Sequence, residues 1–291
     1  MANIKNNRVN IMLAAGKGER FRAEYTDPKP LITVDNEPMV IKAAESFPTA
    51  SERVFLCLQE HIETYALDKK IKEHFADAVI IPVPGVTQGQ ASTCLLAKPY
   101  VDTNAAITVG SCDNGMVYDR QKFDQLLADE ETDAIIWTFR NNPNVKKNPQ
   151  AWGWVKVNDQ GFVEGVSVKI PISDTPMLDH AVVGWFSFKK AGECFAGIEE
   201  MIADDDRIKN EFYLDKLIDR FAKQGKKVRV FEIDTYVGWG TPADLQTYQK
   251  WEAYFAKAKQ DDSFASLTYS GNDIQEQEEF VYWKKYFSAA I

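Results

Sequence analysis

The sequence predicts an α/β fold built on a doubly wound, mostly parallel, Rossmann-like sheet, and two alternating patterns support this prediction. Short apolar runs of strand length occur at residues 9–15, 53–58, 78–83, 105–109 and 133–139. Segments with apolar residues at helical spacing separate them, at residues 39–47, 62–75, 91–97 and 120–128. Strands that alternate with helices are typical of a parallel sheet covered by helices on both faces.

After residue 150 the pattern changes, and a β-rich extension is expected. Residues 154–157 and 162–166 are typical of a hairpin around the turn at residues 158–161. Further strands are expected at residues 181–188 and 228–233, and helices at residues 191–203 and 211–224. We expect this half to extend the sheet and to form one side of a cleft.

The C-terminal part, residues 251–291, is expected to be a helical extension of the main domain at residues 1–250. Aromatic residues are frequent in two predicted helices, at residues 242–259 and 280–290, which an acidic, turn-prone stretch separates. These aromatic side chains would pack either on the body of the protein or on a second copy of the chain. The sequence therefore leaves open whether the chain forms a homodimer.

Charge and hydropathy exclude several classes of protein. Among the 291 residues, 43 are acidic and 34 are Lys or Arg, which gives a net charge of -9 and argues against a protein that grips nucleic acid. No apolar stretch reaches the roughly 18 to 20 residues of a membrane helix. A cytoplasmic location is therefore expected. The four cysteines have no spacing typical of a zinc site, so reduced, partly buried thiols are expected.

A glycine-rich segment at residues 13–21 follows the first predicted strand. Small residues there would allow close approach of the main chain to a phosphate or a base: Leu13, Ala14, Ala15, Gly16 and Gly18. Such a turn alone is weak evidence, because a simple connection between a strand and a helix also often contains glycine. Arg20 and Lys29 place two cations beside it, and this combination favours an anion-binding site.

Residues 13–31 resemble the N-terminal signature of the sugar-1-phosphate nucleotidyltransferase superfamily, and the similarity extends over residues 8–250. The resemblance implies that the glycine loop holds a nucleotide and that Arg20 and Lys29 contact its phosphates during catalysis. It also implies a nucleotide half at about residues 8–140 and an acceptor half at about residues 150–250. The chain is most similar to a bacterial branch that makes capsule and surface polysaccharides, which also resembles cytidylyltransferases of non-sugar phosphates.

Two further segments match the nucleotide half of this superfamily. Residues 84–93 resemble its loop against the nucleobase, which implies nucleotide contacts from Gln88, Gly89 and Gln90. The predicted strand at residues 105–109 leads into Ser111, assigned to the nucleotide, and Asp113, which matches the metal-ligating Asp of the family. A carboxylate at the end of a parallel strand lies where open α/β sheets bind ligands, and its hard oxygen suits Mg²⁺.

The acceptor half matches with two departures. The resemblance implies acceptor contacts from Gly153, Lys169, Asn210 and Glu211, with Lys169 on the acceptor phosphate. Val168 stands where many relatives carry a Glu that meets a sugar hydroxyl, which weakens the inference that the acceptor is a sugar. Gly238 stands where many relatives carry a second metal-binding Asp, so Asp234 is predicted as the second ligand, with Glu211 as the other acidic substitute.

The reaction implied by the resemblance is the attack of an acceptor phosphate on the α-phosphorus of an NTP, with Mg²⁺ as cofactor and pyrophosphate as the leaving group. CTP is favoured as the donor, and the acceptor is a sugar-1-phosphate or a phosphorylated alcohol or amino acid. Two alternatives stay open, a nucleotide-sugar-dependent glycosyltransferase and a non-catalytic nucleotide-sensing module. The first normally needs an Asp-x-Asp motif, whereas Ser111, Cys112 and Asp113 offer one acid.

Overall fold

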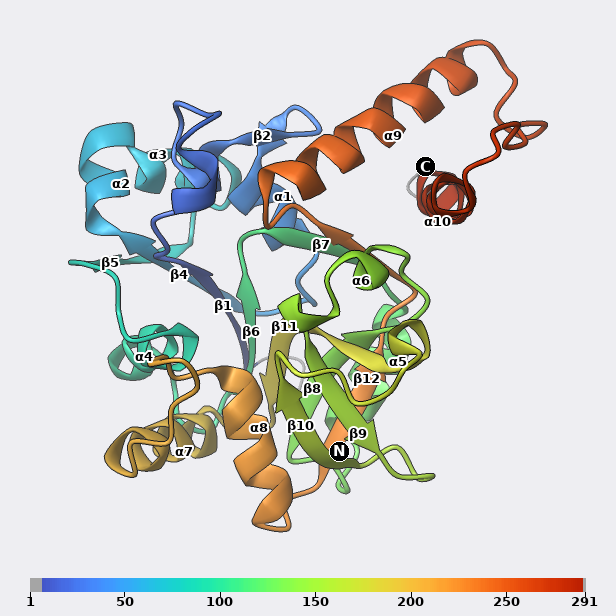
Figure 1. Ribbon diagram of the computed structural model, residues 1–291. Coiled ribbons are helices and arrows are strands. Elements are labelled where there is room, and N and C mark those ends of the chain that lie inside the picture. The colour runs from blue at the N-terminus through green and yellow to red at the C-terminus, as the bar shows by residue number, and fades with distance from the viewer. Residues whose placement is uncertain (1–6, 290–291) are drawn as a thin grey trace.

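The computed structural model describes residues 7–289, and its centre is a nine-stranded sheet (Figure 1). Four parallel strands form its first half in the order β5-β4-β1-β6: β1 (Arg8–Ala14), β4 (Glu52–Leu58), β5 (Val79–Val83) and β6 (Ala106–Ser111). The chain moves outward from β1 through β4 and β5 and then returns to pair β6 with the other side of β1. Open α/β sheets bind ligands at such a reversal, outside the carboxyl ends of the strands.

The second half of the sheet is mixed. Antiparallel β11 (His180–Phe188) joins β6 to β8 (Ala134–Phe139), and β12 (Val228–Glu232) pairs with β8 in parallel. The predicted hairpin is present as β9 (Gly153–Val157) and β10 (Val163–Val168), and β9 pairs with the first residues of β11. The predicted extension of the sheet is therefore confirmed.

Helices form much of the connections between these strands. In the first half these are α1 (Met39–Glu45), α2 (Gln59–Tyr65), α3 (Leu67–His74) and α4 (Gln90–Leu95), with the 3₁₀ helices η2 (Glu19–Phe21), η3 (Lys29–Leu31) and η4 (Lys98–Tyr100). In the second half they are α5 (Arg120–Ala128), α6 (Asn144–Lys147), α7 (Ala191–Ala203) and α8 (Leu214–Lys223), with η5 (Pro149–Ala151) and η6 (Pro176–Leu178).

Both faces of the sheet are buried, as the prediction of a doubly wound sheet requires. Successive side chains of a strand point to opposite faces, and along β1 Ile11 belongs to one apolar cluster whereas Met12 belongs to the other. The cluster around Ile11 includes residues of α4, α7 and α8, and the cluster around Met12 includes residues of α1, α3 and α9. The predicted fold class is therefore confirmed.

Two short ribbons lie outside the main sheet. Antiparallel β7 (Asn114–Val117) and β13 (Thr235–Gly238) form one of them, and β2 (Thr33–Val34) and β3 (Glu37–Pro38) form the other. Because β7 follows β6 after only two residues, the first ribbon fixes the backbone directly beyond the carboxyl end of β6.

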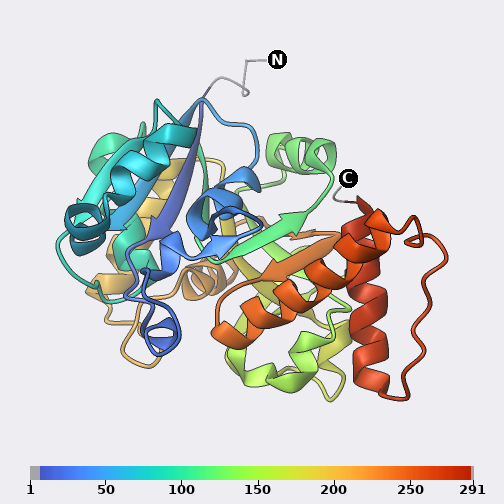
Figure 2. The same cartoon turned by 90° about the horizontal axis from the view of Figure 1, so that it is seen from above.

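The C-terminal extension consists of α9 (Pro242–Gln260) and α10 (Ile274–Ala289), which lie side by side (Figure 2). Thr241 caps α9 by accepting a hydrogen bond from the backbone N–H of Asp244, and Pro242 occupies the first turn, where a missing N–H costs nothing. Buried aromatic side chains join the two helices to the body, among them Tyr248, Trp251 and Trp283. Of the two predicted placements, packing on the body is the one observed for these residues.

The observed elements differ from the predicted ones in a few places. The helix predicted at residues 62–75 is divided into α2 and α3, because Ala66 adopts a left-handed conformation with φ of 53°. The ribbon strands were not predicted, since each has four residues or fewer. All four cysteines are buried and free. Within residues 7–289, no helix has both the length and the apolar composition needed to cross a bilayer.

Candidate active site

The glycine loop leaves β1 directly beside Lys29. Gly18 adopts a left-handed backbone with φ of 64°, and a Cβ at this position would lie 2.6 Å from the Cβ of Lys29. A side chain at residue 18 would therefore strain the backbone and displace Lys29. At Gly16, by contrast, no heavy atom of the described residues beyond its two chain neighbours lies within 4 Å of the Cβ position, so the main chain there is open to a ligand.

Lys29 reaches across to the carboxyl end of β6. Its Nζ donates to Oδ2 of Asp113 at 2.5 Å and lies 3.4 Å from the carbonyl oxygen of Gly240. Burial by itself would raise the pKa of the Asp113 carboxyl, but the charge and hydrogen bond of Lys29, with smaller contributions from Ser111 and Arg20, hold it below its usual value. Asp113 is therefore ionised at neutral pH.

A cavity of about 320 Å³, which we call the glycine-loop cavity, lies over these residues. Eleven of the predicted site residues line it: Leu13, Ala15, Gly16, Gly18, Arg20, Lys29, Gly89, Gln90, Ser111, Asp113 and Glu211. These residues come from segments that are far apart in the sequence, and the reversal of strand order between β1 and β6 brings them together.

The loop before α4 is fixed by the segment that precedes α8. Gly89 has φ of 115°, and a Cβ there would lie 2.7 Å from the carbonyl oxygen of Phe212. The backbone N–H of Phe212 donates to the carbonyl of Gln88 at 2.7 Å, and that of Ala91 donates to the carbonyl of Phe212 at 3.0 Å. This clamp holds Gly89 and Gln90 at the cavity wall.

Three of the residues predicted to contact the nucleotide or the acceptor line neither this cavity nor the neighbouring one described next. Ala14 is 1% exposed and packs in the core. The side chain of Gln88 is exposed, and its carbonyl takes part in the clamp on Phe212. Asn210 is exposed and has a left-handed backbone with φ of 66°, typical of Asn in a turn.

A second cavity, of about 220 Å³, lies between the β9–β10 hairpin and the start of α8, and we call it the hairpin cavity. Gly153 and Lys169, both predicted to contact an acceptor, line it. Lys169 Nζ donates to the hydroxyl of Tyr213 at 3.0 Å, and that hydroxyl donates to Glu211. Glu211 lines the glycine-loop cavity, so residues 211–213 connect the two cavities.

Sequence analysis missed several residues that line the hairpin cavity. Asn114, Gly184, Tyr213, Asp215 and Tyr236 all do so. Gly184 has φ of 90° and lies where the pairing of β11 with β8 shifts register between Val182 and Phe186. A glycine inside a strand pattern is a known sign of a bulge, so this feature was detectable from the sequence.

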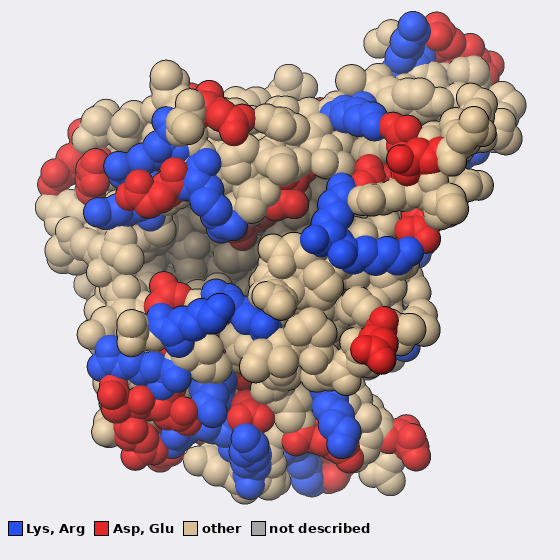
Figure 3. All heavy atoms as spheres, in the orientation of Figure 1, with Lys and Arg blue, Asp and Glu red and all other residues tan. Residues whose placement is uncertain are grey.

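The two cavities meet at the carboxyl end of β6. Three residues line both of them: Gln90, Ser111 and Asp113. Figure 3 shows a hollow on this face of the molecule, with Lys and Arg side chains at its rim. Two ligands bound in the two cavities would therefore face each other across Asp113.

Asp234 lies elsewhere. Its backbone N–H donates to Val117 at 2.9 Å, whereas Trp239 donates to Asp113 at 2.8 Å, so the two acids flank opposite ends of the β7–β13 ribbon. At about 3.3 Å per residue, five residue steps along the ribbon separate their backbones by about 16 Å. The side chain of Asp234 lines a third cavity, and it is therefore not positioned as a second ligand of an ion on Asp113.

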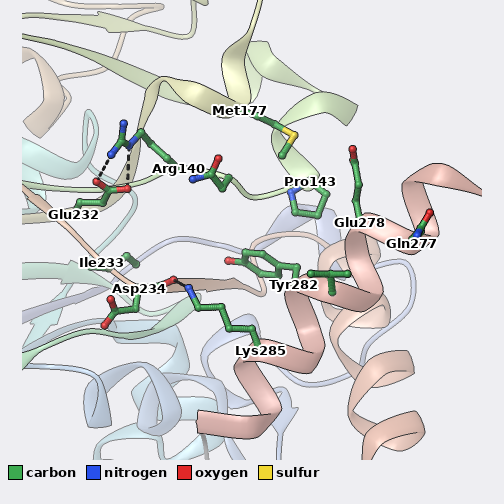
Figure 4. A pocket seen from close by; sticks show the side chains of 12 residues that line it. Arg140, Pro143, Met177, Glu232, Ile233, Asp234, Gln277, Glu278, Tyr282 and Lys285 are labelled. Atoms are coloured by element: carbon green, nitrogen blue, oxygen red, sulfur yellow. Dashed lines mark hydrogen bonds and ion pairs between the residues drawn. The ribbon is translucent and has the colours of Figure 1, made fainter. Parts of the chain in front are cut away.

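The third cavity, of about 720 Å³, lies between the body and α10 (Figure 4). Its charged residues are largely paired: Arg140 donates twice to Glu232, and Lys285 donates to the carbonyl of Asp234 at 3.1 Å. It contains none of the glycine-loop residues.

The junction, where the glycine-loop cavity and the hairpin cavity meet, has residues that fit a magnesium ion held in part by substrate. Within residues 7–289, no group of three or more His, Cys, Asp or Glu side chains could hold a metal ion. Mg²⁺ is commonly bound by one or two carboxylates together with substrate phosphates and water, so an all-protein cage is not required. A Cβ at Gly240 would lie 3.4 Å from Oδ2 of Asp113 and 3.9 Å from Oδ2 of Asp244, which makes Asp244 a neighbouring carboxylate.

Comparison with known proteins identifies the fold. No protein-family model matches the chain, and no curated protein matches it in sequence. It is similar in structure to a nucleoside-diphosphate-sugar pyrophosphorylase from Vibrio cholerae RC9, with a TM-score of 0.66 and 19% identity, over 83% of this chain and 99% of that one. The chain has the nucleotidyltransferase fold.

Two further structures share the nucleotidyltransferase fold. One is assigned as a glucose-1-phosphate thymidylyltransferase from Bacillus anthracis, with a TM-score of 0.67 and 16% identity. The other is the inositol-1-phosphate CTP transferase from T. maritima, with a TM-score of 0.63 and 17% identity. Each match covers 84% of this chain and 94% of the other. The resemblance found in the sequence is thus confirmed at the level of the fold.

Proposed function

We propose that this chain is a nucleotidyltransferase that transfers an NMP unit from an NTP to a small phosphorylated acceptor and releases pyrophosphate. The observation that carries the proposal is the meeting of the glycine-loop cavity and the hairpin cavity at Gln90, Ser111 and Asp113. A transfer between two bound substrates needs adjoining sites with the reacting groups in line. The names of the three similar structures, all of which describe nucleotidyl transfer to or from a sugar or inositol phosphate, support the same reaction.

The NTP would bind in the glycine-loop cavity. The open main chain at Gly16 admits phosphate oxygens, and Arg20 and Lys29 supply positive charge at the same wall. Fixed charges of this kind stabilise the negative charge that develops as pyrophosphate leaves. Gln90, held by the clamp on Phe212, would contact the nucleotide where the two cavities meet.

The acceptor would bind in the hairpin cavity, with its phosphate on Lys169. A phosphate oxygen is already ionised near neutral pH, so it can attack the α-phosphorus without a general base. The residues of the chain then have two tasks, which are to hold two anions in line and to offset their repulsion. Lys29 lines the glycine-loop cavity and Lys169 lines the hairpin cavity, so each would offset the charge of one substrate.

We propose that Mg²⁺ is the cofactor and that Asp113 would hold it, with the remaining ligands supplied by substrate phosphates and water. When bound, such an ion offsets phosphate charge and orients the reacting groups. CTP as the donor, a role in capsule or surface-polysaccharide synthesis and a cytoplasmic location stay as predictions from the sequence.

Pyrophosphate release with a panel of NTPs and acceptor phosphates tests the proposal. We expect release with at least one pair, and we expect Asp113→Asn to lower kcat by about 100-fold or more, because it removes a charge at the junction. Asp77→Asn, an exposed carboxylate in the loop before β5, is the matched control and should leave kcat unchanged. Nucleotide binding without release from any pair would favour a sensing module, and transfer from a nucleotide sugar would favour a glycosyltransferase.

A further inference from the structure

The carboxyl group of Asp215 belongs to a residue that lines the hairpin cavity. Asp215 is the second residue of α8 and is 9% exposed. Among residues 7–289, no atom forms a hydrogen bond with its Oδ1. A Cβ at Gly153 would lie 3.2 Å from that oxygen and 3.0 Å from Cγ2 of Val182, so glycine at this position lets Val182 and Asp215 pack closely against the hairpin.

A second oxygen that accepts no hydrogen bond by distance and angle within residues 7–289 is Oδ1 of Asn114, which is 2% exposed, although the side chain of Asn114 lies close enough to the hydroxyl of Tyr236 to influence its pKa. Its Nδ2 donates to Ser111 Oγ at 2.9 Å and to the carbonyl of Val183 at 3.1 Å. Because a carbonyl only accepts hydrogen bonds, the contact with Val183 determines which end of the amide is the nitrogen. Oδ1 of Asn114 is therefore left as an acceptor in the wall of the cavity.

Gln90 carries a third such atom, since its Oε1 is buried and has no hydrogen-bond partner in the described part of the chain. Asp215, Asn114 and Gln90 all line the hairpin cavity. A buried acceptor that lacks a donor costs free energy, and three of them around one cavity are unusual unless a ligand supplies the donors. A ligand that fits this side of the cavity would therefore carry groups that donate hydrogen bonds.

The position of Asp215 is fixed by the next turn of its helix. Oδ1 of Asp219, four residues later on α8, accepts a hydrogen bond from the backbone N–H of Val166 in β10 at 3.2 Å. This contact holds the helix against the hairpin that carries Val168 and Lys169. Asp215 thus brings a carboxylate from α8 into the cavity in which Val168 has none.

The ionisation of Asp215 also favours a ligand that donates hydrogen bonds. Burial raises the pKa of the Asp215 carboxyl to about 6, and its own backbone amide and the nearby charge of Lys169 oppose that rise. At neutral pH the group is therefore mostly ionised in a place where water is largely excluded. A donor on a bound ligand would offset this cost.

We propose that Asp215 is an acceptor-specificity residue, and that it selects a phosphorylated acceptor whose other end donates hydrogen bonds. This inference rests on the proposed nucleotidyl transfer. Lys169 would hold the phosphate, while Asp215 and Asn114 would bind hydroxyl groups or a primary ammonium group. A quaternary ammonium group would balance the charge of Asp215 but has no donor, so it would leave these acceptors without hydrogen bonds and would be used less well.

Steady-state kinetics with three acceptors at saturating NTP test this inference. A hexose-1-phosphate offers hydroxyl groups, phosphoethanolamine offers an ammonium group, and phosphocholine offers neither. We expect the wild type to use at least one of the first two, which separates the two sources of donors, and to use phosphocholine at least 10-fold less well by kcat/KM.

Asp215→Asn should raise the KM for the preferred acceptor by about 10-fold or more, because a charge-assisted hydrogen bond is lost. The rise in melting temperature caused by the NTP should stay as in the wild type, since Asp215 lies outside the glycine-loop cavity. The matched control is Asp68→Asn, which changes an Asp at the same helical position in α3. It should alter neither quantity.

Two results would overturn the inference while leaving nucleotidyl transfer in place. One is phosphocholine as the best acceptor, and the other is an unchanged acceptor KM in Asp215→Asn. Absence of pyrophosphate release with every acceptor and every NTP would instead refute the proposed function, and this inference with it.

Discussion

Lys29 Nζ and Asp113 Oδ2 form an ion pair of 2.5 Å, although 84 residues separate them in the sequence. Their side chains are 12% and 25% exposed, so both charges are partly removed from water. The pair joins η3, which packs beside the glycine loop, to the carboxyl end of β6. It therefore ties the predicted phosphate-binding cations to the predicted metal-binding acid.

The two members of this pair should be coupled in stability. Lys29→Met leaves the charge of Asp113 without its partner, and Asp113→Asn does the same to Lys29, so each single change should destabilise the protein. The double variant should lose less than the sum, with a coupling free energy of about 1–3 kcal/mol. Urea unfolding of the four proteins without ligand measures this quantity, and additive losses would show that the contact carries no free energy.

Arg20 should affect nucleotide binding without affecting the fold. It is exposed and lines the glycine-loop cavity, so Arg20→Ala should raise the KM for the NTP by about 10-fold or more. Lys17→Ala is the matched control, because Lys17 is an exposed cation of the same loop that does not line the cavity. Equal KM values for the two variants would argue against a phosphate contact from Arg20.

Glycine should be required at position 89 because of the backbone conformation there. Its φ of 115° belongs to a region almost restricted to glycine, and a Cβ would also meet Phe212. Gly89→Ala should cost about 1–3 kcal/mol from strain alone and should loosen the clamp that holds Gln90. Gly85→Ala, in the same loop, should be neutral, because within residues 7–289 no atom beyond its chain neighbours lies within 4 Å of its Cβ position. Melting temperatures of both variants check this. Equal values would show that the backbone of Gly89 and its contact with Phe212 do not stabilise the protein.

Asp215 should lower the stability of the protein at neutral pH. Its pKa is raised to about 6 in the folded state from a usual value of 3.8, so the folded protein binds this proton more tightly than the unfolded chain. The contribution of this group to stability is therefore greatest below about pH 4, falls as the pH rises, and is lost above about pH 6.

The change Asp215→Asn removes this cost, and we expect the melting temperature at pH 8 to rise by about 2 °C or more, with little gain at pH 4. Thermal unfolding at the two pH values measures the effect, and Asp68→Asn serves as the control. A variant that is less stable than the wild type at both values would indicate that the carboxylate supports the structure of α8.

The sheet and much of the candidate site follow from local patterns in the sequence. β1 and β6 are apolar runs that end in the glycine loop and in Asp113, so both segments were identified together with the edge at which they meet. The division of α2 from α3 at Ala66 was missed, because alanine favours helix and nothing nearby in the sequence marks the left-handed turn.

Contacts between distant segments account for the other differences. Asp234 was chosen for its closeness to Gly240 in the sequence, whereas the antiparallel pairing of β13 with β7 carries it to the far end of the ribbon. Asp215 was overlooked because it resembles an ordinary acidic residue at a helix start. Only the packing of α8 against the hairpin places it opposite Gly153.

The fate of isotopic label tests nucleotidyl transfer most directly. With the preferred NTP labelled at the α-phosphorus and, in a parallel reaction, at the γ-phosphorus, we expect the α-label in the product made from the acceptor. The γ-label should appear in pyrophosphate. Appearance of the α-label in free NMP or of the γ-label in inorganic phosphate, with none in the acceptor product, would contradict the proposal.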